Sequence, residues 1–137
     1  MIFLTVSVLA LSFPGCGKKE NTSDRTLRVG IVTYTQDDPF INTMTEQIRE
    51  DLKLKESKDM KILVSVKNGD NDQRDQDELV EEMIAAGCDV LCVNLVDRTA
   101  PSDIIKAARQ EKIPVIFFNR EPVKEDLMQW DQLYYVG

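Results

Sequence analysis

Short apolar runs alternate with longer amphipathic stretches along the chain from Leu27 onward. Each apolar run is rich in β-branched residues, which is typical of a strand buried on both faces. A polar loop and then a stretch with apolar residues at helical spacing follow each run. The unit occurs three times, and strands alternating with helices of this length imply βαβ crossovers. We therefore predict an α/β fold with a doubly wound parallel sheet.

The first unit, LRVGIVTYTQDDPF at residues 27–40, organises the rest of the chain. Its apolar run gives way to a polar loop after Tyr34. Asp38 suits a helix N-cap and Pro39 suits the first helical position, so a helix is expected to begin there. The unit thus places the carboxylate of Asp38 and the ring of Phe40 at the carboxyl end of a strand. Ligands bind at that edge in open α/β sheets.

The remaining elements follow from the same pattern. We expect three helices: one over residues 39–56, one from the end of the 68–72 loop to Gly87, and one over 99–112 with a proline in its first turn. We expect further strands over residues 61–66, 89–95, 115–118 and 134–136. The inward stripe predicted for the first helix is Phe40, Met44, Ile48 and Leu52, widened by Ile41, with Thr45 on the polar face.

The amino-terminal residues resemble an export signal. Residues 2–13 are an apolar run that is too short to span a bilayer but fits the core of a secretory signal. The following Pro14-Gly15-Cys16 resembles the end of a bacterial lipoprotein signal, although Phe13 replaces the usual aliphatic residue and no basic residue precedes the run. We expect a signal peptide over 1–15, a lipid anchor on Cys16 and an exported protein, lipid-anchored or periplasmic. A buried amino-terminal strand is the alternative.

Residues 16–26 are polar and lack apolar periodicity, so they are predicted to form a tether. The net charge of −7, with no basic run beyond Lys18-Lys19, argues against nucleic acid as a partner and against membrane contact other than through a lipid anchor. The sequence has no histidine, no GxxxxGK[ST] and no glycine in its first loop, which disfavours triad, dinucleotide and P-loop enzymes.

Neither the cysteines nor the acidic run predicts a metal site. Cys88 and Cys92 lie four apart in an expected strand, hence on one face and too far apart for a disulfide, so we expect small buried hydrophobes. The run DNDQRDQDE at residues 70–78 has Arg74 and Asp75 where an EF-hand loop needs an oxygen ligand and a glycine. It is predicted to be an acidic first helical turn.

The expected strand ends deliver carboxylates, amides and an aromatic ring, without a nucleophile paired with a base. They are Asp38 with Phe40, residues 68–72, Asn94 with Asp97, and Asn119 with Glu121. Such groups recognise neutral polyhydroxyl compounds, because carboxylates and amides bind hydroxyls and a ring covers the C–H face. Alternatives stay open: Asp38 is a cap alone or also a ligand, Phe40 is core or ligand-facing, and Asn94 is a turn former or a ligand.

Five motifs taken together resemble a known family over residues 27–137. They are VGIVTYTQDDPF, NGDNDQRDQ, AAGCDVLCVNLVD, KIPVIFFNREP and YYVG, and their order and spacing are similar to those of the periplasmic galactose/glucose-binding proteins of the ribose/galactose class. In that family two α/β lobes close on a sugar, with three chain crossings between them. The resemblance implies an incomplete N-terminal lobe, so we expect a fragment that stops near the first crossing.

The resemblance also implies roles for individual residues. Asp38 matches the carboxylate that binds sugar hydroxyls, Phe40 the ring that stacks on the sugar, and Asn94 an amide that binds a hydroxyl. The opposing tryptophan and the calcium loop belong to the second lobe, so no cofactor is expected here, and Trp130 is not that tryptophan. The family delivers sugar to an ABC permease and can signal to a chemoreceptor.

Two rival functions remain. Effector domains of lactose-repressor-type regulators share the fold, but an export signal stands where their helix-turn-helix would be. An α/β enzyme lacks support because no catalytic constellation is present in the sequence.

Overall fold

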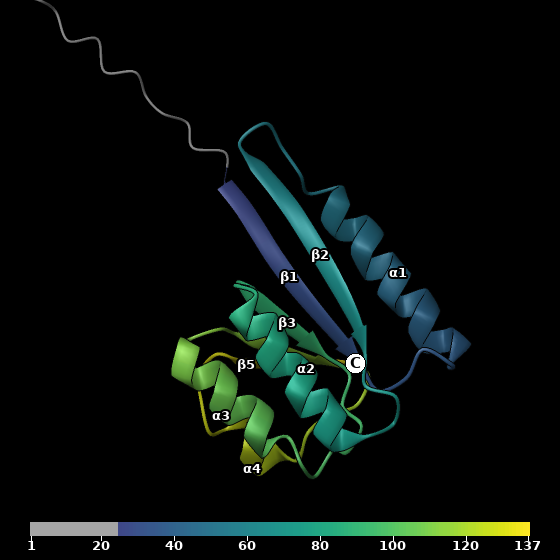
Figure 1. Ribbon diagram of the computed structural model, residues 1–137, viewed down its shortest axis with the longest axis vertical. Coiled ribbons are helices and arrows are strands. Elements are labelled where there is room, and N and C mark those ends of the chain that lie inside the picture. The colour runs from purple at the N-terminus through teal and green to yellow at the C-terminus, as the bar shows by residue number, and fades with distance from the viewer. Residues whose placement is uncertain (1–24) are drawn as a thin grey trace, which may run out of the picture.

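The computed structural model describes residues 25–137, which form an all-parallel five-stranded sheet of order β2-β1-β3-β4-β5 (Figure 1). The strands are β1 (Arg25–Thr33), β2 (Met60–Asn68), β3 (Val90–Val93), β4 (Val115–Phe118) and β5 (Leu133–Val136). The helices are α1 (Pro39–Lys53), α2 (Gln73–Ala85), α3 (Ser102–Glu111) and the short α4 (Lys124–Leu127). The predicted α/β fold is confirmed.

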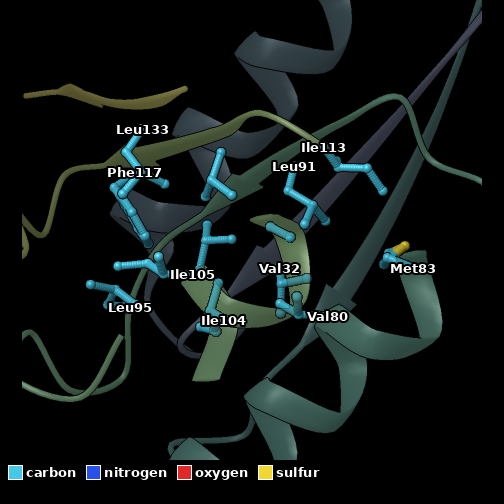
Figure 2. Close-up of a cluster of buried hydrophobic side chains, with 13 residues drawn as sticks. Val32, Val80, Met83, Leu91, Leu95, Ile104, Ile105, Ile113, Phe117 and Leu133 are labelled. Carbon is cyan, nitrogen blue, oxygen red and sulfur yellow. The ribbon is translucent and has the colours of Figure 1, made fainter. Parts of the chain in front are cut away.

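Two apolar clusters lie on opposite faces of the sheet and show that it is doubly wound. One cluster joins α2 and α3 to the strands, with Val80 and Ile104 packed among residues such as Phe117 (Figure 2). The other joins α1 to the opposite face, where Ile48 packs with Ile31. The inner strands β1, β3 and β4 are mostly buried, which is why they read as continuous apolar runs, whereas the edge strands β2 and β5 alternate between exposed residues and buried or partly buried ones.

The strand order reverses between β1 and β3. The chain runs from β1 to β2 at one edge of the sheet and then returns past β1 to form β3. The connection after β1 therefore leads toward the β2 edge, and the connection after β3 leads toward the β5 edge. In open α/β sheets the crevice at such a reversal is the usual ligand site. The topology therefore singles out the carboxyl ends of β1 and β3.

Several boundaries differ from the sequence prediction. Strand β1 begins at Arg25, inside the predicted tether, because Arg25 and Thr26 pair with the start of β2. Helix α1 ends at Lys53 rather than at residue 56. Strand β3 is limited to Val90–Val93.

The third helix and the segment before β5 also differ. Helix α3 begins at Ser102, and Pro101 is its N-cap residue rather than part of its first turn. Helix α4 was not predicted, since four residues carry too little periodicity to be seen. Strand β4 has the predicted bounds.

The inward face of α1 is centred differently from the prediction. Thr45, placed on the polar face, is only 5% exposed, whereas Phe40, placed at the head of the stripe, is 59% exposed. Steps of four residues advance by about 400°, so a strict four-residue stripe drifts by about 40° at each step. Met44, Ile48 and Leu52 are partly buried and pack against the core as predicted, but the most buried positions are Ile41, which is 1% exposed, and Thr45.

The two cysteines of this region lie on opposite faces of the sheet, so the prediction of a shared face is wrong. Cys88 precedes β3, in the turn that ends α2, where its N–H donates to the Met83 carbonyl oxygen over 3.2 Å. Helix α2 ends at Ala85 with Ala86 as its C-cap, and Gly87, to which the helix was predicted to extend, makes the turn with φ +79°. Cys88 packs on the α2 side and Cys92 on the α1 side, and both are free thiols.

The predicted signal peptide (1–15), the lipid-anchor residue Cys16 and most of the tether lie outside the described residues. Within residues 25–137, none of the helices has the length and apolar character needed to cross a bilayer.

Candidate functional site at the carboxyl edge of the sheet

Four loops at the carboxyl edge are joined by hydrogen bonds in two pairs. The backbone N–H of Asn71, after β2, donates to the Tyr34 carbonyl oxygen, after β1, over 2.7 Å. Asn94, after β3, donates through Nδ2 to Asn119 Oδ1, after β4, over 3.2 Å. The structure thus brings together the four strand ends that the sequence pattern predicted to carry polar chemistry.

Asp38 uses both carboxylate oxygens. Oδ1 accepts from the Phe40 backbone N–H over 2.8 Å and so caps α1, as predicted. Oδ2 accepts from the Tyr34 hydroxyl over 2.7 Å. The Tyr34 hydrogen bond, followed by that of Phe40, holds the pKa of Asp38 below its usual range. The carboxylate is therefore ionised, and each oxygen keeps further acceptor capacity.

Tyr34 is itself held by Arg120. The guanidinium carbon of Arg120 lies 3.6 Å from the centroid of the Tyr34 ring. The hydrogen bond to Asp38 is the main reason that the pKa of Tyr34 is raised, so the phenol stays protonated and donates. Sequence reasoning missed both residues, because contact between loops so distant in the chain leaves no periodic signal.

Phe40 presents its ring to solvent from the first turn of α1, beside the Asp38 cap. With 59% of the residue exposed, it is not a core residue, and that alternative is excluded. An exposed aromatic face next to an ionised carboxylate can cover the C–H face of a ring that carries hydroxyl groups.

Asn94 is completely buried at the end of β3. Its Nδ2 donates to the Phe118 carbonyl oxygen over 3.1 Å as well as to Asn119. Its Oδ1 is buried and has no hydrogen-bond partner, so an acceptor is left over beneath the edge. The amide ties β3 to β4, and its role as a sugar ligand stays a prediction.

Two glutamines of α2 hold the loop after β3 from below. Gln76 is fully buried, donates through Nε2 to the Asn94 carbonyl oxygen and accepts at Oε1 from the Val96 N–H, both over 2.9 Å. Gln73 accepts from the Asp97 N–H over 2.8 Å. Sequence reasoning missed them inside the acidic run, where two uncharged residues three apart on one helical face are the available signal.

Asp97 and Asp72 accept hydrogen bonds from residues that follow them closely in the chain. The Asp97 carboxylate accepts from the backbone N–H and the hydroxyl of Thr99, and these bonds lower the pKa of Asp97. Asp72 caps α2 by accepting from the Asp75 N–H, in line with the predicted acidic first turn. Among residues 25–137, no group of three or more histidine, cysteine or acidic residues is placed to hold a metal ion.

The family model described as "Periplasmic binding protein domain" matches residues 29–137. The D-galactose/methyl-galactoside binding periplasmic protein of Haemophilus influenzae is 34% identical over 110 residues, which are 80% of this chain and 32% of that protein. The ribose import binding protein of Bacillus subtilis is 26% identical over 125 residues, 87% of this chain and 39% of that protein. The chain therefore spans about a third of the length of these curated relatives.

Solved structures show the same fold. A carbohydrate transporter solute-binding protein from Chloroflexus aurantiacus, in complex with D-glucose, superimposes with a TM-score of 0.63 and 28% identity, covering 82% of this chain and 30% of that one. An ABC transporter periplasmic solute-binding protein from Actinobacillus succinogenes, with bound D-allose, gives a TM-score of 0.65 at 22% identity, covering 81% and 38%.

Proposed function

Because the chain belongs to the periplasmic binding protein domain family, we propose that it forms the N-terminal sugar-binding lobe of the solute-binding component of an ABC importer. The family is a solute-binding one and is not catalytic. The observation that carries the proposal is the pairing of an ionised Asp38 with an exposed Phe40 at the strand-order reversal.

The proposed ligand is a monosaccharide, galactose or glucose. Asp38 accepts hydrogen bonds from sugar hydroxyls, and the Phe40 ring stacks on the C–H face of the sugar. Asn94 is the third proposed contact through its unpartnered Oδ1, but the side chain is completely buried in this structure, so the loop after β4 must move before a sugar can reach it. The names of the Haemophilus relative and of the Chloroflexus structure, which refer to galactose and to D-glucose, support this ligand class.

The chain is proposed to be one of two lobes that close on the ligand. The chain spans about a third of its relatives, so the other lobe, with any calcium site, belongs to sequence that this chain does not contain. The two-lobe protein would hand its sugar to an ABC permease and could also signal to a chemoreceptor. Export through residues 1–15 and lipid attachment at Cys16 complete the proposal.

A titration of the protein with galactose and glucose, followed by ¹H–¹⁵N NMR, tests the sugar site. A single lobe should bind sugar weakly, with a Kd of about 1 mM or more, which corresponds to a binding free energy of about −4 kcal/mol at best. The shifts should centre on residues 34–40. Asp38→Ala should weaken binding by about tenfold or more, while Asp59→Ala, before β2, should not. Shifts located elsewhere, or no shifts at the carboxyl edge, would overturn the site.

Lipid attachment separates the importer from its rival, the effector-binding domain of a regulator. Cells fed an alkyne-tagged fatty acid should label the protein, and Cys16→Ser should abolish the label. An unlabelled cytosolic protein would favour the regulator.

A further inference from the structure

Arg120 occupies a crossing point between three loops at the carboxyl edge. It follows Asn119, whose φ of +61° turns the chain sharply after β4. Its Nη1 donates to the carbonyl oxygens of Leu95 and Val96, over 3.1 and 3.0 Å, in the loop after β3. The planar face of the guanidinium lies against the Tyr34 ring, in the loop after β1. The side chain is thereby fixed at both its edge and its face.

Tyr34 passes this constraint on to Asp38. The guanidinium covers one face of the ring and restricts its movement, and in this position the Tyr34 hydroxyl donates to Asp38 Oδ2. The second carboxylate oxygen is held by the helix N-terminus. The carboxylate plane is therefore fixed at two points, one of which depends on Arg120.

We propose that Arg120 is a positioning residue for ligand recognition, acting through Tyr34 to fix the direction of the Asp38 carboxylate. The inference rests on the proposed function of this edge and deepens it. Since the Tyr34 proton is committed to Asp38, the Tyr34 oxygen and both Asp38 oxygens face the ligand as acceptors. The edge therefore selects hydroxyl groups that donate.

The geometry requires a guanidinium rather than a positive charge alone. Lysine would keep the charge near Tyr34, and its ammonium also has enough donors for the two carbonyl oxygens that Nη1 contacts, but it has no flat face to stack on the ring. Asp38 otherwise meets backbone N–H groups and the Tyr34 hydroxyl, and Arg120 is the charged side chain that acts on it. Arg120→Lys thus removes the stacking that positions Tyr34 while keeping the positive charge near Asp38.

The pKa of Asp38, measured from its carboxyl ¹³C shift in the sugar-free protein, tests the proposal. Tyr34→Phe should raise that pKa, and Arg120→Lys should raise it as well although the charge is kept. In a Tyr34→Phe background, Arg120→Lys should add nothing, because the route through the hydroxyl is already lost. Arg98→Lys, at the same edge, is the matched control and should leave the Asp38 pKa unchanged.

Equal effects of Arg120→Lys in both backgrounds, or no effect in the wild type, would overturn the proposal. The wild-type protein supplies a second measurement that needs no variant: the guanidinium protons of Arg120 should be shifted upfield by the Tyr34 ring. Free-arginine shifts would also overturn it. These readouts need no sugar, so a confirmed coupling in a protein that binds no sugar would refute the proposed function and leave the positioning intact.

Discussion

The side-chain amide of Gln76 donates a hydrogen bond to the backbone carbonyl oxygen of Asn94 over 2.9 Å. The same amide accepts from the backbone N–H of Val96, so one buried side chain satisfies two backbone groups of the loop after β3. A buried loop with unpaired backbone groups is costly. Helix α2 therefore supports the candidate site as well as the core.

Gln76→Ala should lower the free energy of unfolding by about 2–4 kcal/mol, because it strands the buried carbonyl of Asn94 and the partly buried N–H of Val96. Gln73→Ala, three residues earlier on the same helix, removes bonds to the exposed Asp97 N–H and to the Asp77 carboxylate and should cost about 1 kcal/mol or less. Urea denaturation of both variants checks the difference. Equal losses would contradict a special role for Gln76.

Gly69→Ala should cost more stability than Gly87→Ala. A Cβ at Gly69 would lie 2.8 Å from the Thr33 carbonyl oxygen, so the backbone must shift, at about 2–3 kcal/mol. Gly87 has φ +79° and open space around it, so alanine there pays only for its backbone conformation, about 1 kcal/mol. Thermal unfolding of the pair, with the reverse ranking as the refuting result, tests this.

Phe40 and Ile41 are neighbours in sequence, but their replacement by alanine should have different effects on stability. Ile41→Ala empties a buried site and should cost about 2–5 kcal/mol of stability. Phe40→Ala removes an exposed ring and should change stability by about 0.5 kcal/mol or less, while weakening the sugar-induced NMR shifts. A large loss of stability in Phe40→Ala would show that the ring serves the fold.

Stability should fall at alkaline pH because of Cys92. Burial raises the pKa of the Cys92 thiol from 9.0 to about 11, so between these values the unfolded chain loses a proton that the folded chain keeps. The contribution is present below pH 9 and is lost, at about 1.4 kcal/mol per pH unit, as the pH rises to about 11. Cys92→Ala should flatten this part of the pH profile measured by urea denaturation.

Most of the fold was predictable because it depends on local periodicity. The alternation of β-branched runs and amphipathic stretches predicted the parallel sheet, and the Asp38-Pro39 pair predicted where α1 begins. The errors arose where tertiary packing decides. The rotation of α1 that buries Thr45 depends on how the helix sits on the sheet, and the opposite faces of Cys88 and Cys92 depend on where β3 begins.

The position of the candidate site was predictable, but the contacts between its side chains were not. The order of strands and loops predicted a site at the carboxyl edge of the sheet, with Asp38 and Phe40 as candidate residues. The stacking of Arg120 on Tyr34 could not be predicted, because it depends on the spacing of β1 and β4, which are separated in the sheet by β3. The burial of Asn94 likewise depends on the position of the loop after β4.

Strand β1 also sets the distance between the site and whatever precedes Arg25. Its nine residues, at about 3.3 Å each, place the entry of the chain roughly 30 Å from the carboxyl edge, at the opposite end of the sheet. If residues 1–24 attach the protein to a surface, that attachment joins the sheet at the end opposite the candidate site.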